Sequence, residues 1–298
     1  MKSLRKILLT GGTGFIGSRL VNGLVAHGDT VTIVSREPEH HRSARAGVDY
    51  AGWLPDLARY QAVVNLAGEP IFGKRWNAEQ KARIRSSRVE GTRRLVEAMR
   101  AVEKRPAVLV NASAVGYYGD RGAELLPESA PPGNDFMAEV CKAWEAEAQR
   151  AEELGVRVVC MRFGIVLGRD GGALQRMLPP FKLGFGGPIG SGAQYMSWVH
   201  LKDLIGLILF ALDRADLRGA VNGTAPGSVT NREFSRALGR VLHRPSFLPV
   251  PPLALRVAFG EVAEVLTASQ RCVPDRALGA GHVYAFPDVE GALRDILA

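Results

Sequence analysis

The chain has 298 residues, of which 46% are hydrophobic and 23% are charged, and its formal net charge is +8. This length and apolar content allow a large core and exclude a disordered or low-complexity protein. No apolar stretch is long enough to span a membrane, and no basic run alternates with aromatic residues, so neither a membrane nor nucleic acid is expected as a partner. The net positive charge is explained more simply by a positive field around a binding site for a phosphorylated small molecule.

Cysteine and histidine usage adds two expectations. Cys141, Cys160 and Cys272 are widely separated and form no CxxC pair. Together with the lack of a secretory signal, this pattern predicts a reducing, cytoplasmic compartment. The adjacent pair His40-His41 has no evident third ligand, and neighbouring side chains point apart, so we expect no metal site.

The first predicted strand, residues 6–10, runs directly into Gly11-Gly-Thr-Gly-Phe-Ile-Gly17, and an apolar helical repeat begins at once. A strand, a glycine turn and a helix in this order are typical of a dinucleotide-binding site. Gly11 allows the tight turn, Gly14 leaves room for the pyrophosphate, and Gly17 lets the helix pack on the strand. The free N–H groups of the first helical turn would face the anion.

The second predicted strand, Thr30 to Val34, indicates which dinucleotide binds. It ends in Ser35-Arg36, where an NAD-binding site usually carries an Asp or Glu for the ribose 2′-hydroxyl. A hydroxyl followed by a guanidinium suits a 2′-phosphate, which Arg36 can neutralise. The alternative is that Arg36 is a solvated loop residue. We interpret the pattern as NADP(H) binding.

The next strand and helix contribute two more candidates. Residues 62–66 form an apolar run that ends in Ala67-Gly68, small enough for the backbone to pass close to the nucleotide. A helix is expected from Asn77, its predicted N-cap. Arg88 interrupts the apolar face of this helix, and because a buried charge is seldom left unpaired, it should meet either a ligand phosphate or a carboxylate.

Further strands are expected at residues 106–111 and 155–162, with a helix capped by Asn134-Asp135 between them. Alternating strands and helices predict an α/β fold, a Rossmann-type doubly wound parallel sheet. From Phe163 the glycine content rises, and residues 164–168, 171–172 and 184–192 are expected to be loops. We therefore expect an NADP-binding domain over 1–163. Residues 164–298 should form mainly a smaller α/β substrate lobe, with some segments returning to the sheet.

With these residues in view, the whole chain resembles the extended short-chain dehydrogenase/reductase superfamily. It is most similar to the atypical "epimerase family protein" branch, whose members are loosely called nucleoside-diphosphate sugar epimerases. The resemblance rests on motifs spread from the glycine turn to residue 226: Gly11–Gly17, Ser35-Arg36, Asn65–Glu69, Arg75–Asn77, Ser87-Arg88, Tyr117–Gly119, Lys142–Glu145, Gly164–Gly168, Gly186–Gly192, Trp198–His200 with Asp203, and Asn222–Pro226.

The resemblance implies NADP(H) as the cofactor. Carried over residue by residue, it places the cofactor on the glycine turn, the end of the second strand, and four later positions: Gly11, Gly14, Phe15, Ile16, Gly17, Ser35, Arg36, Leu66, Ala67, Arg88 and, beside the nicotinamide, Leu167.

The usual catalytic pair of the superfamily is missing. A Tyr is expected four residues before Lys142, but Ala138 stands there, and shifting the frame by one gives Met137 and Cys141. Substitute hydroxyls lie on the segment after the 106–111 strand, at Ser113, Tyr117 and Tyr118. Each could act as an acid or orient a substrate, although both tyrosines could also be structural.

Two other candidates rank below these hydroxyls. His200 stands at a strand-to-helix junction, where a structural role is favoured over a catalytic one. Cys141 has apolar neighbours and no evident His partner, which argues against a nucleophile.

Two functions stay open at this point. The first is an NADP(H)-dependent oxidoreductase or epimerase-like enzyme, acting on an unknown carbonyl or sugar-derived small molecule as a monomer or homodimer. The second is a catalytically degenerate NADP(H)-binding sensor or scaffold. The missing Tyr favours the sensor, and the retained second lobe favours the enzyme.

Overall fold

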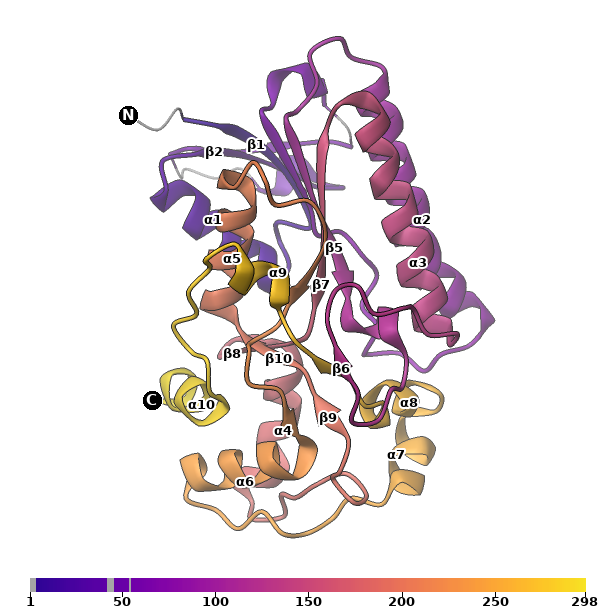
Figure 1. Ribbon diagram of the computed structural model, residues 1–298, viewed down its shortest axis with the longest axis vertical. Helices are drawn as coiled ribbons and strands as arrows, with labels where there is room; N and C mark the ends of the chain where they lie inside the picture. Colours follow the sequence, from indigo (N-terminus) through magenta and orange to yellow (C-terminus); the bar gives the residue numbers. More distant parts are fainter. Residues whose placement is uncertain (1–3, 42–45, 54) are drawn as a thin grey trace.

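The computed structural model describes residues 4–41, 46–53 and 55–298. At its centre is a seven-stranded parallel sheet in the order β11-β7-β5-β4-β1-β2-β3 (Figure 1). Its strands are β1 (Lys6–Thr10), β2 (Thr30–Val34), β3 (Val48–Ala51), β4 (Ala62–Asn65), β5 (Val108–Ala114), β7 (Arg157–Phe163) and β11 (Gly219–Gly223). Helices flank the sheet on both sides, so the expected doubly wound Rossmann-type fold is confirmed.

Helices pair on each face of the sheet. On one face α1 (Phe15–Ala26) packs beside α5 (Leu201–Asp213), and on the other α2 (Ala78–Arg100) packs beside α3 (Phe136–Gln149). Successive residues of β1 alternate between the two cores: Ile7 belongs to the core containing α1 and α5, and Leu8 to the core containing α2. Burial on both faces explains why the central strands are continuous apolar runs.

The predicted caps are present. Asn77 accepts the Gln80 N–H at 2.7 Å at the start of α2, and Asp135 accepts the Ala138 N–H at 2.9 Å at the start of α3. A full capping box does not form at Asn77, because the Gln80 side chain donates to Glu69 instead of returning to the cap. These contacts fix where two long helices begin, independently of their packing.

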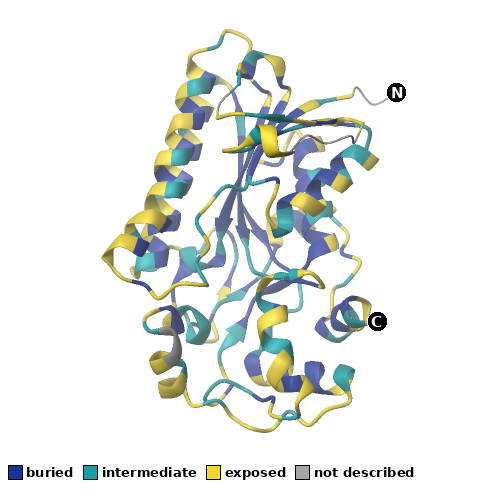
Figure 2. Ribbon diagram, turned by 180° about the vertical axis from the view of Figure 1, so that it is seen from behind, coloured by how far each residue is buried: buried dark blue, intermediate teal, exposed yellow. Residues whose placement is uncertain are grey.

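The second lobe is built from short elements below the sheet (Figure 1). Three two-stranded sheets join β6 (Leu125–Leu126) to β13 (Arg271–Cys272), β8 (Ile165–Gly168) to β10 (Trp198–His200), and β9 (Tyr195–Met196) to β12 (Val229–Thr230). The helices are α4 (Gly172–Lys182), α6 (Asn231–Leu242), α7 (Pro252–Phe259), α8 (Val262–Thr267), α9 (Asp275–Gly279) and α10 (Val289–Leu297). Buried residues of α4, α6 and α10 form one core, and Figure 2 shows these helices close together.

Two expectations for this region are wrong. Residues 164–168 were expected to form a loop, but 165–168 form β8, which pairs in parallel with β10. Gly172 was also expected in a loop, and it begins α4. Both elements depend on partners remote in sequence, which a local count of glycines does not reveal.

The boundary at residue 163 stays a prediction. Two elements that follow residue 163 in the chain belong to the sheet layer: β11 pairs with β7 as the seventh strand, and α5 covers the sheet beside α1. No helix in the described ranges is long and apolar enough to cross a membrane.

Candidate functional site

The turn after β1 has the geometry that its glycines predict. Gly11 has φ +69°, and a Cβ there would lie 2.7 Å from the carbonyl of Leu66, so a side chain would strike the neighbouring strand end. At Gly17 a Cβ would lie 2.1 Å from the Gly11 oxygen. Helix α1 has no side-chain N-cap, and its first intrahelical bond runs from Ser18 N to Gly14 O at 2.9 Å. The preceding amides, including those of Phe15 and Ile16, are therefore available to an anion.

Buried amides tie three strand ends together beside this turn. Asn65 accepts from the Thr10 hydroxyl at 2.6 Å, and donates to Asn111 at 2.6 Å and to Thr92 at 2.9 Å. The Ala67 N–H donates to the Thr10 hydroxyl at 3.2 Å, which holds the Leu66-Ala67 segment against the turn. Sequence reasoning missed this network. The signal was an asparagine ending each of two apolar strand runs.

Phe15 joins the turn to the second lobe. A Cβ at Gly168, Gly171 or Gly172 would lie 2.8, 2.4 or 3.0 Å from its ring, so these three glycines leave the space that the ring fills. Leu167, in the same segment, is fully buried and pairs with His200 across β8 and β10. The nucleotide turn and the start of α4 are thus in direct contact.

Ser35 and Arg36 follow β2, as predicted. The Ser35 N–H donates to Ala51 at 3.0 Å, and the Ser35 hydroxyl accepts from Glu37 N at 3.2 Å. This turn leaves the Arg36 side chain exposed at the carboxyl end of β2. In a parallel sheet that end is the nucleotide side.

Of the two partners expected for Arg88, the described residues supply no carboxylate, and the ligand phosphate stays a prediction. Its Nη1 donates to the carbonyl oxygens of Glu69 at 3.0 Å and Ile84 at 3.1 Å, and its guanidinium lies 5.2 Å from the centre of the Trp144 ring. A Cβ on Gly68 would lie 3.0 Å from its Cζ. In the described part of the chain no carboxylate is within ion-pair distance, and burial lowers the pKa of Arg88. A desolvated cation therefore lies directly beside the Leu66–Gly68 segment.

Ser113 belongs to a buried ionic network. Its hydroxyl donates to Glu145 at 2.6 Å, and Glu145 binds Arg162 through two contacts of 2.8 Å. Glu145 is 4% exposed and Arg162 3% exposed, so the pair is removed from water. The sequence did not predict that these two residues pair, although Glu145 ends one of the motifs named above and Arg162 lies near the end of an apolar strand.

The two tyrosines differ in their surroundings. Tyr118 is fully buried, and its hydroxyl donates to Asn222 at 2.8 Å and accepts from Arg162 at 2.9 Å. Burial raises the pKa of Tyr118 well above its ordinary value. Tyr117 is half-buried with its ring over Arg162, whose Cζ lies 3.4 Å from the ring centre. Within the described ranges its hydroxyl has no hydrogen-bond partner, so Tyr117 is better placed than Tyr118 or Ser113 to meet a ligand.

The positions of the missing Tyr–Lys pair carry no equivalent chemistry. Ala138 is fully buried, whereas Lys142 is exposed and forms an ion pair with Glu139 at 2.8 Å. Burial raises the pKa of the Cys141 thiol to about 12, so this cysteine is protonated at neutral pH and is a poor nucleophile.

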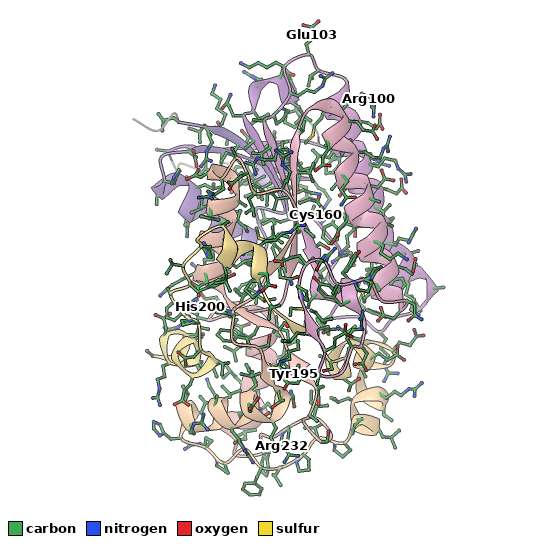
Figure 3. All side chains as sticks on the ribbon, in the orientation of Figure 1. Arg100, Glu103, Cys160, Tyr195, His200 and Arg232 are labelled. Atoms are coloured by element: carbon green, nitrogen blue, oxygen red, sulfur yellow. The ribbon has the colours of Figure 1, made fainter. Side chains whose placement is uncertain are left out.

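His200 has the structural role that was favoured for it. Its Nδ1 accepts the Lys202 N–H at 3.0 Å and caps α5, and its Nε2 lies 3.2 Å from Asp295. Figure 3 labels His200 near the junction of the sheet and the second lobe. The ring stacks on Phe286 at 4.0 Å.

In the part of the chain that the structure describes, no group of three or more His, Cys, Asp or Glu could hold a metal ion.

Comparison with known proteins agrees with this geometry. The model of the NAD dependent epimerase/dehydratase family matches residues 7–222, which include the glycine turn, five of the seven central strands entirely and most of the other two, β1 and β11. The chain belongs to this family. A second model, for a domain of unknown function (DUF1731), matches residues 250–296. The resemblance drawn from the sequence motifs is thereby confirmed.

Individual relatives cover the whole chain. An epimerase family protein, the SDR39U1 homolog of Arabidopsis thaliana described as chloroplastic, is 42% identical over 99% of this chain and 88% of its own. The human epimerase family protein SDR39U1 is 40% identical over 98% of this chain and 100% of its own. A crystal structure of the human protein, isoform 2, with NADPH has a TM-score of 0.88 at 37% identity and covers 98% of both chains.

Proposed function

We propose that this family member binds NADP(H) and uses it on a small carbonyl or sugar-derived molecule, as an oxidoreductase or epimerase-like enzyme with a non-standard active site. The observation that carries the proposal is the uncapped start of α1 behind Gly11, next to the exposed Arg36. The amides suit a pyrophosphate, and the guanidinium suits a 2′-phosphate. The human relative described with NADPH supports the choice of cofactor.

Titration of the purified protein with NADPH and NADH tests the cofactor. NADPH should bind at least about tenfold more tightly, a modest gain for one charge-assisted contact. Arg36→Asp should reverse the preference. Arg94→Asp is the matched control, because it makes the same charge change on an exposed position of α2 and should leave the ratio unaltered. Equal affinities for the two cofactors in the wild-type protein would contradict the proposal.

For the chemistry, we propose Tyr117 as the proton donor. NADPH would supply a hydride to the carbonyl carbon, and the Tyr117 hydroxyl would give its proton to the carbonyl oxygen. Tyr117→Phe should lower turnover by about 10²-fold or more, the range typical for loss of a general acid. Ser113→Ala and Tyr118→Phe disturb the buried network instead, so they should act mainly through stability. Full activity of Tyr117→Phe would move the proton donor elsewhere.

A second candidate is an NADP(H)-dependent sensor or scaffold without turnover. It is favoured by the buried Ala138 at the usual tyrosine position and by the outward ion pair of Lys142. A screen against sugar nucleotides, aldehydes and quinones separates the two candidates. Tight NADPH binding without oxidation by any of these substrates would support the sensor.

The proposal also includes the division of the chain, the oligomeric state and the compartment that were expected from the sequence. We propose a nucleotide-binding part up to residue 163 with a mainly substrate-binding part after it, in a monomer or homodimer. The three free cysteines are all buried, which fits a cytoplasmic, reducing setting. The Arabidopsis relative is described as chloroplastic, so the compartment differs at least in that protein.

A further inference from the structure

The excess positive charge is concentrated in two segments of the second lobe. Residues 171–200 and 231–260 carry seven Arg or Lys and one Glu, whereas the other 238 residues carry 31 Arg or Lys and 29 Asp or Glu. Most of the net charge of +8 therefore comes from about a fifth of the chain.

The same segments also expose large apolar side chains. Leu183 is 71% exposed, Phe185 65% and Phe247 73%. On α7, Leu253 and Val257 are 72% and 68% exposed, and their spacing of four residues puts them on one side of the helix. These five residues are called the apolar rim below. Exposed apolar groups of this size mark an interaction surface where neighbouring segments bring them together.

Hydrogen bonds hold the two loops of the apolar rim side by side. The Leu248 N–H donates to Gly186 O at 3.2 Å, and the Val250 N–H donates to Pro188 O at 2.8 Å. Arg244 Nε donates to Lys182 O at 3.2 Å, which joins the end of α4 to the turn after α6. The connection from α6 to α7 then runs along one end of the molecule, at the bottom in Figure 1.

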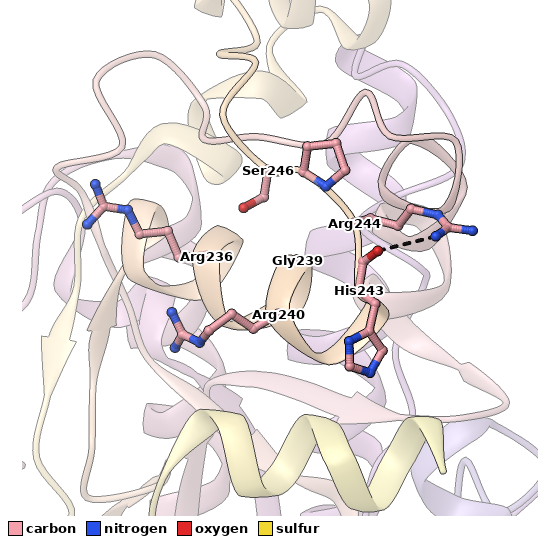
Figure 4. A pocket seen from close by; sticks show the side chains of 7 residues that line it. Arg236, Gly239, Arg240, His243, Arg244 and Ser246 are labelled. Carbon is pink, nitrogen blue, oxygen red and sulfur yellow. Dashed lines mark hydrogen bonds between the residues drawn. The ribbon is translucent and has the colours of Figure 1, made fainter.

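A basic hollow adjoins this rim. It has a volume of about 460 Å³ and is lined by Arg236, Gly239, Arg240, His243, Arg244, Pro245 and Ser246 (Figure 4). His243 has φ +53°, a left-handed conformation that residues other than glycine seldom adopt. Arg240 forms an ion pair with Glu290 at 2.6 Å. Figure 4 shows the side chains of Arg236, Arg240 and Arg244 spread around the hollow.

We propose that this end of the protein docks on the surface of an anionic membrane. Phe185, Phe247 and the leucines would enter the boundary between headgroups and acyl chains, while the hollow would take a lipid phosphate. A second copy of the chain fits less well, because pairing of the rims supplies no anionic group to the basic residues beside them. The contact is peripheral and leaves the fold unchanged, and it departs from the expectation drawn from the sequence that no membrane is a partner.

Vesicle co-sedimentation tests the proposal. The wild-type protein should sediment with phosphatidylcholine vesicles that contain phosphatidylglycerol and stay in solution with phosphatidylcholine alone. Raised salt should weaken the binding. Arg236→Gln with Arg244→Gln removes two charges and should weaken it about 30-fold, whereas Phe185→Ser with Phe247→Ser should weaken it at least about tenfold.

Val283→Ser and Arg94→Gln are matched controls, since both residues are exposed and lie outside the two segments. Both controls should bind vesicles as the wild type does, and circular dichroism should show every variant folded. Absence of binding to phosphatidylglycerol vesicles, or equal binding by all variants, would overturn the proposal. Binding of inorganic phosphate without vesicle binding, or dissociation of an oligomer by the phenylalanine changes, would also overturn it, in favour of a free phosphate ligand or a second copy.

Discussion

Replacing Glu145 by glutamine should strongly destabilise the protein. Glu145 on α3 accepts three short hydrogen bonds, two from Arg162 and one from Ser113. A glutamine in the same place keeps the size of the side chain and one acceptor oxygen. Its amide nitrogen, however, would face a nitrogen of the Arg162 guanidinium, and both groups are donors.

The cost follows from the cation that is left behind. In the variant, Arg162 would keep the Tyr118 hydroxyl at 2.9 Å and the Glu128 carbonyl at 3.2 Å, both uncharged. Because Arg162 is 3% exposed, water does not replace the lost carboxylate. Breaking one side of a buried ion pair typically costs about 3–5 kcal/mol, and we expect that loss in the free energy of unfolding.

Urea unfolding followed by circular dichroism measures this loss, and α3 offers a matched control. Glu139→Gln removes a carboxylate from the same helix, but its partner Lys142 is 42% exposed. An exposed pair contributes at most about 1 kcal/mol, so this variant should unfold almost as the wild type does. Glu145→Leu with Arg162→Met removes both charges and should recover much of the stability.

The reasoning would be refuted if Glu145→Gln lost no more stability than Glu139→Gln. It would also fail if Glu145→Leu with Arg162→Met lost more free energy of unfolding than the summed losses of Glu145→Leu alone and Arg162→Met alone. Either result would mean that the charge of Arg162 is compensated by something other than Glu145. The network would then not explain why Ser113 and Tyr118 are held in place.

Three further predictions concern the turn, the nucleotide side and pH. Gly17→Ala should prevent stable folding or displace α1, because its Cβ would lie 2.1 Å from the Gly11 oxygen, and thermal unfolding checks this. Arg88→Ala should weaken NADPH binding in a titration and leave the far-UV circular dichroism spectrum unchanged, because the cation lies beside Gly68 and no described carboxylate pairs with it. Unchanged affinity would mean that Arg88 has only a structural role. Burial lowers the pKa of His282. Below about pH 6.5 the unfolded chain therefore binds a proton that the folded protein does not, and the free energy of unfolding decreases as the pH is lowered. His282→Phe should flatten this part of the pH–stability curve, and a curve identical to that of the wild type would count against the assignment.

Local signals explain what the sequence predicted well. The glycine turn, the end of β2 and the caps at Asn77 and Asp135 depend on residues within a few positions of one another. Their backbone requirements are the same whatever the rest of the chain does. The geometry of the glycine turn and the starts of α2 and α3 could therefore be predicted before the fold was known.

Contacts between remote residues explain what was missed. Arg162 ends a strand and Glu145 lies on the preceding helix, so each alone resembles an ordinary charged residue at the edge of an element. Their pairing appears only when α3 packs against β5 and β7. The same holds for β8, whose partner β10 lies about thirty residues away in the chain and cannot be identified from local propensity.

The charge distribution leads to a last prediction, which separates the two ligands proposed for this protein. Outside the two basic segments the chain is nearly neutral, with 31 basic and 29 acidic residues, so we now expect no broad positive field around the nucleotide turn, unlike the use of the charge first suggested by the sequence. NADPH should then be held by amides and a few local cations such as Arg36, and its affinity should fall only modestly as salt rises. Vesicle binding should fall steeply over the same range, because many exposed charges contribute to it together. The two salt titrations can be run on one preparation, by NADPH fluorescence and by co-sedimentation. Parallel slopes would show that a shared field serves both sites, which the nearly neutral remainder of the chain argues against.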